Sequence, residues 1–335
     1  MLINKSEEKS LLNKKKLLIT APLSFAPELL KQIKLKFDVF YEYQPPKEEL
    51  VKLIKEFQPH AWIPKPCNEY LIDEELIKLS SNLEIIATPS TGTNHINLEI
   101  AKKLNIEIFS LKNSDVVHKI KASSEYTFAL ILATVRKIPK ASIKVKEGNW
   151  RKVENSLRSR ELSELTLGIV GCGRIGGNLI KYSEPFGMKI NVYDPYIEIP
   201  FNSRVNVCEE LEILFKNSDI VAICVHLNEE TRGMIGEKQI SQMKQGSFLI
   251  NTSRGEILDE KALIKGLESG ILVGAGVDVV CDEHLLPNNQ NILINYSKNN
   301  NNLIVTPHIA GLTSDSEKKA QRAAYEACLK HFNLN

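Results

Sequence analysis

His308 is the residue of this sequence best placed for acid–base chemistry. It follows an apolar run, in "NLIVTPHIAG", that is typical of a buried strand. Histidine exchanges a proton near neutral pH, but a histidine at a strand end can equally be structural. Arg254 in "FLINTSRGE" and Glu283 in "GVDVVCDE" follow earlier apolar runs of the same kind. The three side chains therefore have to be interpreted together.

An imidazole, a carboxylate and a guanidinium suit the reduction of a 2-oxo acid, in which the carbonyl carbon receives a hydride and its oxygen a proton. The imidazole can exchange that proton. A carboxylate bonded to its other ring nitrogen would fix the tautomer and favour the protonated ring. An arginine can hold the substrate carboxylate through two parallel hydrogen bonds. Structural alternatives exist for each residue: Arg254 at a helix terminus, and Glu283 in a solvated loop between Asp282 and His284.

A glycine-rich turn provides a second constellation. In "LGIVGCGRIGGNLI", Gly171, Gly173 and Gly176 have the spacing G-x-G-x-x-G, with a strand pattern before them and a helix pattern after them. The first glycine would make the tight turn, the second would let the backbone approach a pyrophosphate, and the third would permit close helix packing. The N–H groups at the helix start would face the phosphate charge. A plain tight turn is the alternative.

Asp194 ends the next predicted strand, "INVYDP", 18 residues after Gly176. A carboxylate at this position can accept hydrogen bonds from the hydroxyls of an adenosine ribose, and it would repel a 2′-phosphate. No arginine directly follows Asp194. The sequence therefore predicts NAD rather than NADP as the cofactor.

From about Ile85 to Leu312, these motifs in this order resemble the NAD-dependent D-isomer-specific 2-hydroxyacid dehydrogenases, a family with phosphoglycerate and glycerate enzymes. The resemblance implies Arg254 as the substrate-binding arginine, Glu283 as the carboxylate behind the histidine and His308 as the acid–base. It also implies a group of residues at the NAD site: Arg174, Ile175, His226, Thr231 near the nicotinamide ribose, Thr252, Asp278 near the carboxamide, and Gly311.

Two softer matches concern the substrate. "PSTGTNHIN" resembles the family's substrate loop, in which the N–H groups of Thr91 and Gly92 would hold the substrate carboxylate; an ordinary glycine turn is the alternative. Lys65, in "WIPKPCN", lies where phosphoglycerate enzymes often have a phosphate-binding arginine. A solvated loop lysine is the preferred interpretation, and phosphate binding the other.

The chain also departs from the family. "HLNEET" is two residues shorter than the usual loop before the threonine, and His284 stands where a proline commonly follows the glutamate. The regulatory domain of the longer phosphoglycerate enzymes is not expected, although short versions of these enzymes also exist. The substrate therefore stays open within the 2-hydroxy acids. A non-catalytic NAD(H)-sensing scaffold is the alternative function, and a formate dehydrogenase is disfavoured by the glutamate behind His308.

Alternating strand and helix patterns must position these residues. One series starts at Lys16 and a second at Leu165, whose six apolar runs match a full dinucleotide-binding sheet. With the resemblance, this predicts an α/β protein of two Rossmann-like domains with parallel sheets: a split, flavodoxin-like substrate domain, 1–113 and 311–335, and an NAD-binding domain, 114–310. A helix capped by Ser123 or Ser124, apolar from Phe128 to Ala133, is either a dimer interface or a core helix.

Composition excludes other classes. Lys and Arg number 43 against 41 Asp and Glu, a net charge of +2, so neither nucleic acid nor an anionic membrane is expected as the main partner. The six cysteines, Cys67 among them, are scattered without metal-ligand spacing, which predicts reduced thiols, no metal and a cytoplasmic location. No secretory leader is expected, because the stretch "MLINKSEEKSLLNKKK" lacks an apolar core flanked by a small-residue cleavage site. The expected partners are a small-molecule acid and, from the resemblance, a second copy in a homodimer.

Overall fold

The computed structural model describes residues 14–66, 70–197, 204–283 and 290–334. The chain divides into two compact units: unit 1 contains residues 1–120 and 312–335, and unit 2 contains residues 121–311. The sequence analysis predicted the first border between the domains at 113/114. It lies at 120/121 because Val117 and Ile120 pack in one apolar cluster with Leu111, Ala320 and Ala323 of unit 1. The functional roles of the two units stay predictions.

Unit 1 contains five parallel strands in the order β2-β1-β3-β4-β5, which is the flavodoxin-like order. Their register is regular, and the three central strands are buried on both faces, as parallel strands covered by helices should be. The order reverses between β1 and β3. The strands are β1 (Lys16–Ile19), β2 (Asp38–Tyr41), β3 (Ala61–Ile63), β4 (Ile85–Ala87) and β5 (Glu107–Phe109).

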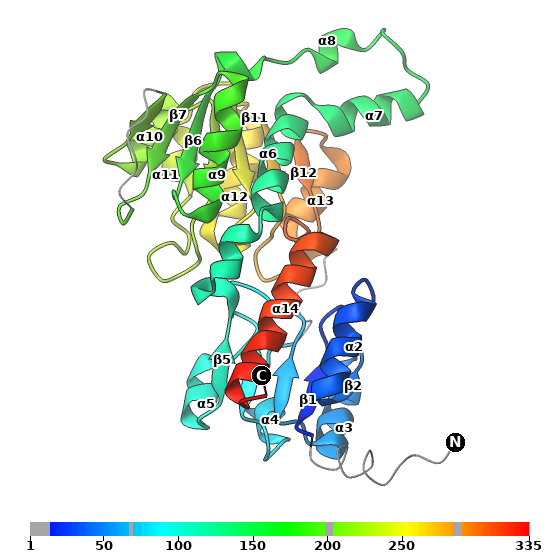
Figure 1. Cartoon of the computed structure of the whole chain (residues 1–335). Coiled ribbons are helices and arrows are strands. Elements are labelled where there is room, and N and C mark those ends of the chain that lie inside the picture. The colour runs from blue at the N-terminus through cyan, green and yellow to red at the C-terminus, as the bar shows by residue number, and fades with distance from the viewer. Residues whose placement is uncertain (1–13, 67–69, 198–203, 284–289, 335) are drawn as a thin grey trace. The chain divides into compact units, whose positions relative to one another are not determined.

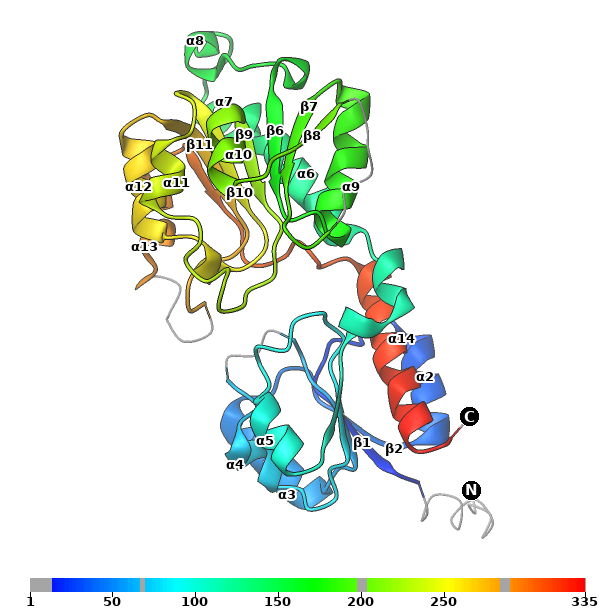
Figure 2. The same ribbon diagram turned by 90° about the vertical axis from the view of Figure 1, so that its left-hand side faces the viewer.

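Helices cover both faces of this sheet (Figure 2). On one face, α2 packs with α14, so the last helix of the chain completes the first unit. On the other face, α3 buries Leu50 and Ile54, one turn apart, beside α4 and α5. The helices are α2 (Pro27–Lys36), α3 (Lys47–Phe57), α4 (Glu74–Lys78), α5 (Leu98–Lys103) and α14 (Ser314–His331), with two 3-10 turns, η1 (Leu111–Asn113) and η2 (Asp115–Lys119).

Unit 2 contains seven parallel strands in the order β12-β11-β10-β9-β6-β7-β8. Numbered within the unit, this is the doubly wound order 3-2-1-4-5-6 extended by one strand. The fold class expected from the sequence is confirmed, with one strand, β8, added to the expected six. The strands are β6 (Thr166–Val170), β7 (Lys189–Tyr193), β8 (Val205–Val207), β9 (Ile220–Ile223), β10 (Ser247–Asn251), β11 (Leu272–Val277) and β12 (Leu303–Val305).

Two layers of helices cover this sheet, as Figures 1 and 2 show for α9 on one face and α10 to α12 on the other. The helices are α6 (Ala122–Val135), α7 (Ile138–Lys146), α8 (Glu154–Leu157), α9 (Arg174–Ser183), α10 (Leu211–Asn217), α11 (Glu237–Ser241), α12 (Glu260–Glu268) and α13 (Ile292–Asn299). The 3-10 turns are η3 (Leu162–Glu164), η4 (Glu184–Phe186) and η5 (Gly255–Ile257).

The apolar helix expected after Ser123 is α6, and it is a core helix of unit 2. It begins at Ala122, after Lys121, and no side chain caps it, so the expected serine cap was wrong. Phe128 and Ile131 lie in the same buried cluster as residues of β6, β9 and β10. Its apolar composition is therefore explained by packing within the chain.

No helix among the described residues is long and apolar enough to span a membrane. Cys67 and His284 lie outside the described residues.

Candidate active site

The three predicted catalytic residues follow three neighbouring strands of the unit 2 sheet. Arg254 comes after β10, Glu283 after β11 and His308 after β12. Because the strands are parallel, their carboxyl ends meet at one edge, where doubly wound sheets bind ligands. The sheet order thus brings together residues that are as far as 54 positions apart in the sequence.

His308 and Glu283 are hydrogen-bonded partners. The contact joins His308 Nδ1 to Glu283 Oε1, and about a quarter of each side chain is exposed, 27% and 28%. A carboxylate at Nδ1 orients the ring and leaves Nε2 for proton exchange, as in the histidine–carboxylate pairs of known enzymes. The pairing expected from the sequence is therefore present in the structure.

Asp278 holds the turn that carries His308. It is 1% exposed. Its carboxylate accepts hydrogen bonds from Thr306 Oγ1 at 2.6 Å, from the Ile309 N–H at 3.0 Å and from the Ala310 N–H at 2.7 Å. A carboxylate accepts about four hydrogen bonds, and three are made inside the turn. The contact of Asp278 with a nicotinamide carboxamide stays a prediction. The sequence did not indicate this clamping role.

Gly255 explains how the Arg254 segment reaches the Glu283 segment. A side chain at Gly255 would place its Cβ 2.0 Å from the Val280 carbonyl carbon and 2.3 Å from the Cys281 nitrogen. The two backbones are in contact, and only glycine fits between them. The half-buried Arg254 donates from Nη1 to the Ser253 carbonyl oxygen at 2.6 Å.

Two buried polar residues that the sequence analysis did not select support these segments. Asn251 donates to the Arg254 carbonyl oxygen at 2.9 Å and accepts from the Ser253 N–H at 3.0 Å. Glu260 accepts from the Cys281 N–H at 2.7 Å and from Asn291 at 3.1 Å, just before and just after the Glu283 loop. The sequence does contain a signal for Asn251, because it is a turn-forming residue at the end of a predicted strand. The burial of Glu260 had none.

The glycine-rich turn has the geometry of a phosphate loop. Gly171 has a φ of 94°, and a Cβ there would lie 2.7 Å from Val225. Gly176 packs against the Gly171 carbonyl oxygen, which a Cβ would meet at 2.1 Å. A Cβ on Gly173 would meet nothing within 4 Å, so this position faces open space. With α9 starting at Arg174 and no side chain capping it, its first N–H groups can bind an anion.

Asp194 lies beside this loop. Its carboxylate accepts from the Cys172 N–H at 2.7 Å and from the N–H groups of Tyr196 at 2.9 Å and Ile197 at 3.2 Å. Asp194 thus joins the end of β7 to the loop after β6, next to the point where the strand order reverses. Burial, and then the Asp194 charge, raise the pKa of the Cys172 thiol, and burial lowers the pKa of Arg174.

The remaining predicted NAD residues lie in unit 2, in loops or in the first turn of α9. Thr231 Oγ1 donates to the His226 carbonyl oxygen at 2.6 Å and closes the short loop after β9. Thr252 is buried and bonds the Thr127 hydroxyl of α6 at 2.7 Å. Gly311 is exposed, and Ile175 lies in the first turn of α9. Their contacts with NAD stay predictions.

The predicted substrate residues of unit 1 lie at the carboxyl edge of its sheet. Thr91 and Gly92 are half-buried in the loop after β4, and their N–H groups have no acceptor within the described part of the chain. Lys65 follows β3, beside the reversal of strand order, and its Nζ donates to Gln44 Oε1 at 2.6 Å. Gln44 has a left-handed φ of 49° and donates its N–H to the Thr20 carbonyl oxygen. This lysine is therefore held in place.

The described residues contain no group of three or more side chains that could hold a metal ion. The groups present are a histidine–carboxylate pair, an arginine, and N–H donors at the start of α9 and in the loop after β4. Groups of these kinds are chemically capable of proton exchange and of binding carboxylate or phosphate.

Comparisons with known proteins agree with this chemistry. The family model described as "D-isomer specific 2-hydroxyacid dehydrogenase, NAD binding domain" matches residues 128–310. The hydroxypyruvate reductase of Thermotoga maritima is 31% identical over 288 residues, covering 86% of this chain and 89% of the relative. The D-3-phosphoglycerate dehydrogenase of Methanocaldococcus jannaschii is 31% identical over 307 residues, covering 91% of this chain but 55% of the relative.

Among solved structures, the D-lactate dehydrogenase of Aquifex aeolicus, complexed with NAD and lactic acid, superposes with a TM-score of 0.74 at 28% identity. The match covers 96% of this chain and 98% of that one. The comparisons confirm the resemblance inferred from the motifs.

Proposed function

Because the chain belongs to the D-isomer specific 2-hydroxyacid dehydrogenase family, we propose that it interconverts a short, polar D-2-hydroxy acid and its 2-oxo acid with NAD(H). The observation that carries the proposal is the His308–Glu283 pair at the edge of the unit 2 sheet that also bears Arg254 and the glycine-rich loop. NAD(H) supplies or accepts the hydride when bound. The protein's own groups provide binding, orientation and the proton.

We assign the proton to His308 Nε2, since Nδ1 is bonded to Glu283. During reduction the protonated ring gives its Nε2 proton to the carbonyl oxygen, and Glu283 stabilises the charged ring before that transfer. Arg254 binds the substrate carboxylate in unit 2. In unit 1, the N–H groups of Thr91 and Gly92 bind a carboxylate oxygen.

Unit 2 is the proposed NAD-binding domain, and unit 1 the substrate-binding domain. The residues present fit a dinucleotide: Gly173 faces open space, the first N–H groups of α9 have no side-chain cap, and Asp194 lies beside the loop. Asp194 takes the ribose hydroxyls. His226, Thr231 and Asp278 are assigned to the nicotinamide end.

We propose that Lys65 recognises the polar group on the third carbon of the substrate, at the end opposite its carboxylate. Its ammonium is held by Gln44 and lies 5.7 Å from the centre of the Tyr43 ring. Relatives of the chain are named for hydroxypyruvate, glyoxylate and 3-phosphoglycerate. A hydroxyl or phosphate at the third carbon suits a fixed ammonium better than an apolar chain does. Lys65→Met should raise the KM for such acids more than that for glyoxylate; equal KM changes would remove this role.

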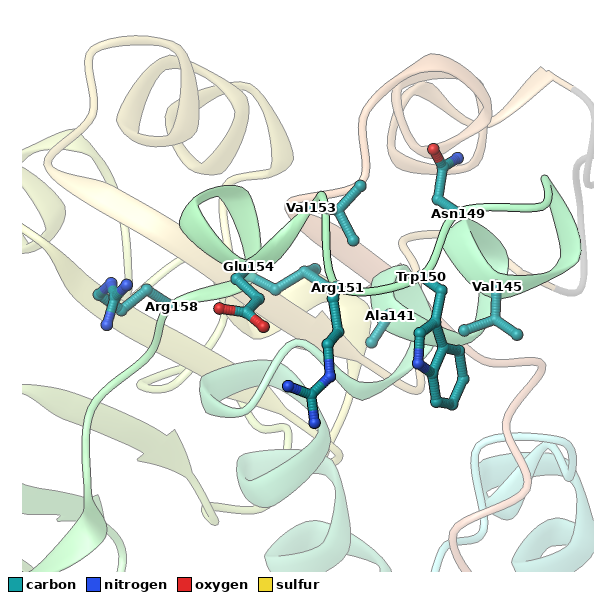
Figure 3. A pocket seen from close by; sticks show the side chains of 9 residues that line it. Ala141, Val145, Asn149, Trp150, Arg151, Val153, Glu154 and Arg158 are labelled. Carbon is teal, nitrogen blue, oxygen red and sulfur yellow. The ribbon is translucent and has the colours of Figure 1, made fainter.

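We also propose a homodimer formed through an arm, residues 136–160, which contains no buried residue. The arm includes α7 and α8, which extend from the body of unit 2 in Figure 1. Trp150 is 71% exposed and Val145 51%. Figure 3 shows the two side chains at a pocket of the arm. The pocket has a volume of about 400 Å³. Exposed apolar side chains that lie together on a surface mark interaction sites. The proposed partner of this surface is a second copy of the chain.

Sedimentation equilibrium tests the dimer. The expected mass is twice 37.7 kDa, and Trp150→Glu should lower it toward the monomer while leaving NADH binding unchanged. A concentration-independent monomer mass for the unaltered protein would exclude the dimer. A cytoplasmic location is proposed with it, because the described cysteines, Cys172, Cys208, Cys224, Cys281 and Cys328, are all free thiols.

Steady-state NADH oxidation against a panel of 2-oxo acids, with and without a phosphate group, tests the activity. We expect turnover with one or more short polar acids and loss of turnover in His308→Ala. Tight NADH binding without turnover on any acid would favour an NAD(H)-sensing scaffold instead.

A further inference from the structure

A chain of side-chain hydrogen bonds crosses the loop after β4. Thr88 Oγ1 lies 3.0 Å from His95 Nε2 and 2.9 Å from Ser90 Oγ, and Ser90 Oγ donates to the Gly92 carbonyl oxygen at 2.6 Å. Thr88 is fully buried, and Ser90 and His95 are half-buried. The bonds connect both ends of the loop to its tip.

The direction of each bond follows from the last one. The Gly92 carbonyl oxygen can only accept, so the hydroxyl proton of Ser90 points to it. Ser90 therefore accepts from the Thr88 hydroxyl, and Thr88 in turn accepts from His95. His95 must carry a proton on Nε2. The sequence of donors is His95 to Thr88 to Ser90 to Gly92.

Backbone bonds make the same loop rigid. The Thr88 N–H donates to the Phe109 carbonyl oxygen at 2.9 Å, and the Ser90 carbonyl oxygen accepts from Leu111 at 2.8 Å. At the other end, the His95 carbonyl oxygen accepts from the Ile72 N–H at 2.8 Å. The tip between these anchors carries the N–H groups of Thr91 and Gly92.

The arrangement does not suit Ser90 as a nucleophile. A nucleophilic serine needs a base at its hydroxyl, whereas the Ser90 proton is given to a carbonyl and the histidine contacts Thr88 instead. The hydrogen-bond chain suits a supporting role, because fixed N–H donors bind an anion without having to reorganise.

We propose that His95, Thr88 and Ser90 are positioning residues that hold the N–H groups of Thr91 and Gly92 in place for the substrate carboxylate. The inference rests on the proposed function, in which these N–H groups bind that carboxylate. In this role the three side chains contact only the loop itself. Loss of the hydrogen-bond chain should therefore weaken binding of the 2-oxo acid and leave proton transfer at His308 intact.

Kinetics on Ser90→Ala, Thr88→Val and His95→Leu test the proposal, with Ser90→Thr and His95→Gln as conservative variants that keep a donor. For the 2-oxo acid with the highest turnover, we expect the KM of the three disruptive variants to rise about tenfold or more, equivalent to about 1.4 kcal/mol. Their kcat and NADH Kd should change less than about threefold. The conservative variants should recover most of the loss.

The ring nitrogens of His95, observed by NMR with ¹⁵N-labelled histidine, provide a readout besides activity. The unaltered protein should show the Nε2–H tautomer or the doubly protonated ring, and Thr88→Val should shift the Nε2 resonance, because the acceptor of its proton is lost. An Nδ1–H tautomer in the unaltered protein, or an unchanged KM in both Ser90→Ala and Thr88→Val, would overturn the proposal. If the unaltered protein reduced no acid on the panel, the proposed function would fail, and the tautomer would decide the hydrogen-bond chain separately.

Discussion

The backbone N–H of His308 donates to the carbonyl oxygen of Asp278 at 2.8 Å, while His308 has a left-handed φ of 53°. A residue other than glycine in this conformation persists only where its surroundings hold it, and such residues concentrate at functional sites. Asp278 supplies the hold from both its carbonyl and its carboxylate. The backbone that directs the imidazole is therefore held by the residue that directly follows the neighbouring strand, β11.

Asp278→Ala should lower the free energy of unfolding by about 2 kcal/mol or more, because it leaves the N–H groups of Ile309 and Ala310 without an acceptor and each costs roughly 1–3 kcal/mol. Thr306 Oγ1 keeps its contact with the Val277 carbonyl oxygen at 3.4 Å. Asp278→Asn keeps one oxygen and should lose less. Urea denaturation at pH 7 measures both. Equal stability of the alanine variant and the unaltered protein would mean that the 306–310 turn needs no clamp.

His308→Ala should lower kcat by about 10² to 10⁴, the usual contribution of general acid–base catalysis, and leave the NADH Kd nearly unchanged. Glu283→Gln keeps a hydrogen bond to the ring without the negative charge and should lose less. Steady-state kinetics and fluorescence titration with NADH separate the two quantities. A His308→Ala protein with normal kcat would exclude the acid–base role.

Much of the candidate site could be predicted because the residues that bind or react lie in short sequence motifs, and the same motifs indicate the strand and helix around them. The glycine spacing, the strand before it and the helix after it are all local, so Gly171, Gly173 and Gly176 were found from the sequence. The bond between His308 and Glu283 was expected from the family resemblance, and the order of β11 and β12 shows how residues from separate segments meet.

The supporting residues could not be predicted, because their role depends on burial and on contacts across the sheet. Glu260 reads as a surface residue at the start of a helix, yet it is 9% exposed and bonds both sides of the Glu283 loop. The serine cap of α6 failed for the same reason: Ser124 is fully buried, and its hydroxyl accepts a hydrogen bond from Asn178 of α9 rather than from the helix's own backbone.

Asp194→Ala should relax the preference for NADH over NADPH by about tenfold to a hundredfold, since a hydrogen bond to a charged group contributes roughly 1.5–3 kcal/mol. The gain for NADPH also reflects the lost repulsion of its 2′-phosphate. The ratio of kcat/KM for the two cofactors is the measurement, with the melting temperature as a control for the loop contacts of Asp194. If the ratio did not change, another feature would set the preference.

Acidification should destabilise unit 1 through His60. Burial, and then the charge of Lys15, lower the pKa of His60 below its ordinary 6.5, and its Nδ1 accepts the Lys16 N–H at 3.1 Å. Between the lowered pKa of the folded state and 6.5, the unfolded chain binds more protons than the folded one. The contribution of neutral His60 to the free energy of unfolding is therefore complete above pH 6.5, and it is lost as the pH falls from 6.5 through the pKa of the folded state. His60→Asn keeps an acceptor and cannot titrate. Its unfolding free energy should fall less between pH 7.5 and 5.5 than that of the unaltered protein; parallel curves would exclude His60 as a cause.

Gly173 and Gly176 form a matched pair that separates cofactor binding from folding. In Gly176→Ala the new Cβ would meet the Gly171 carbonyl oxygen at 2.1 Å, so the free energy of unfolding should fall by about 1–3 kcal/mol, the usual range for overpacking. In Gly173→Ala the Cβ meets no protein atom within 4 Å, and the φ of −66° suits alanine, so stability should change by less than about 1 kcal/mol. If a pyrophosphate approaches the backbone there, the NADH Kd of Gly173→Ala should still rise about tenfold, or about 1.4 kcal/mol. Denaturation and NADH titration on the same two proteins measure both quantities. An unchanged Kd in a stably folded Gly173→Ala protein would place the pyrophosphate elsewhere.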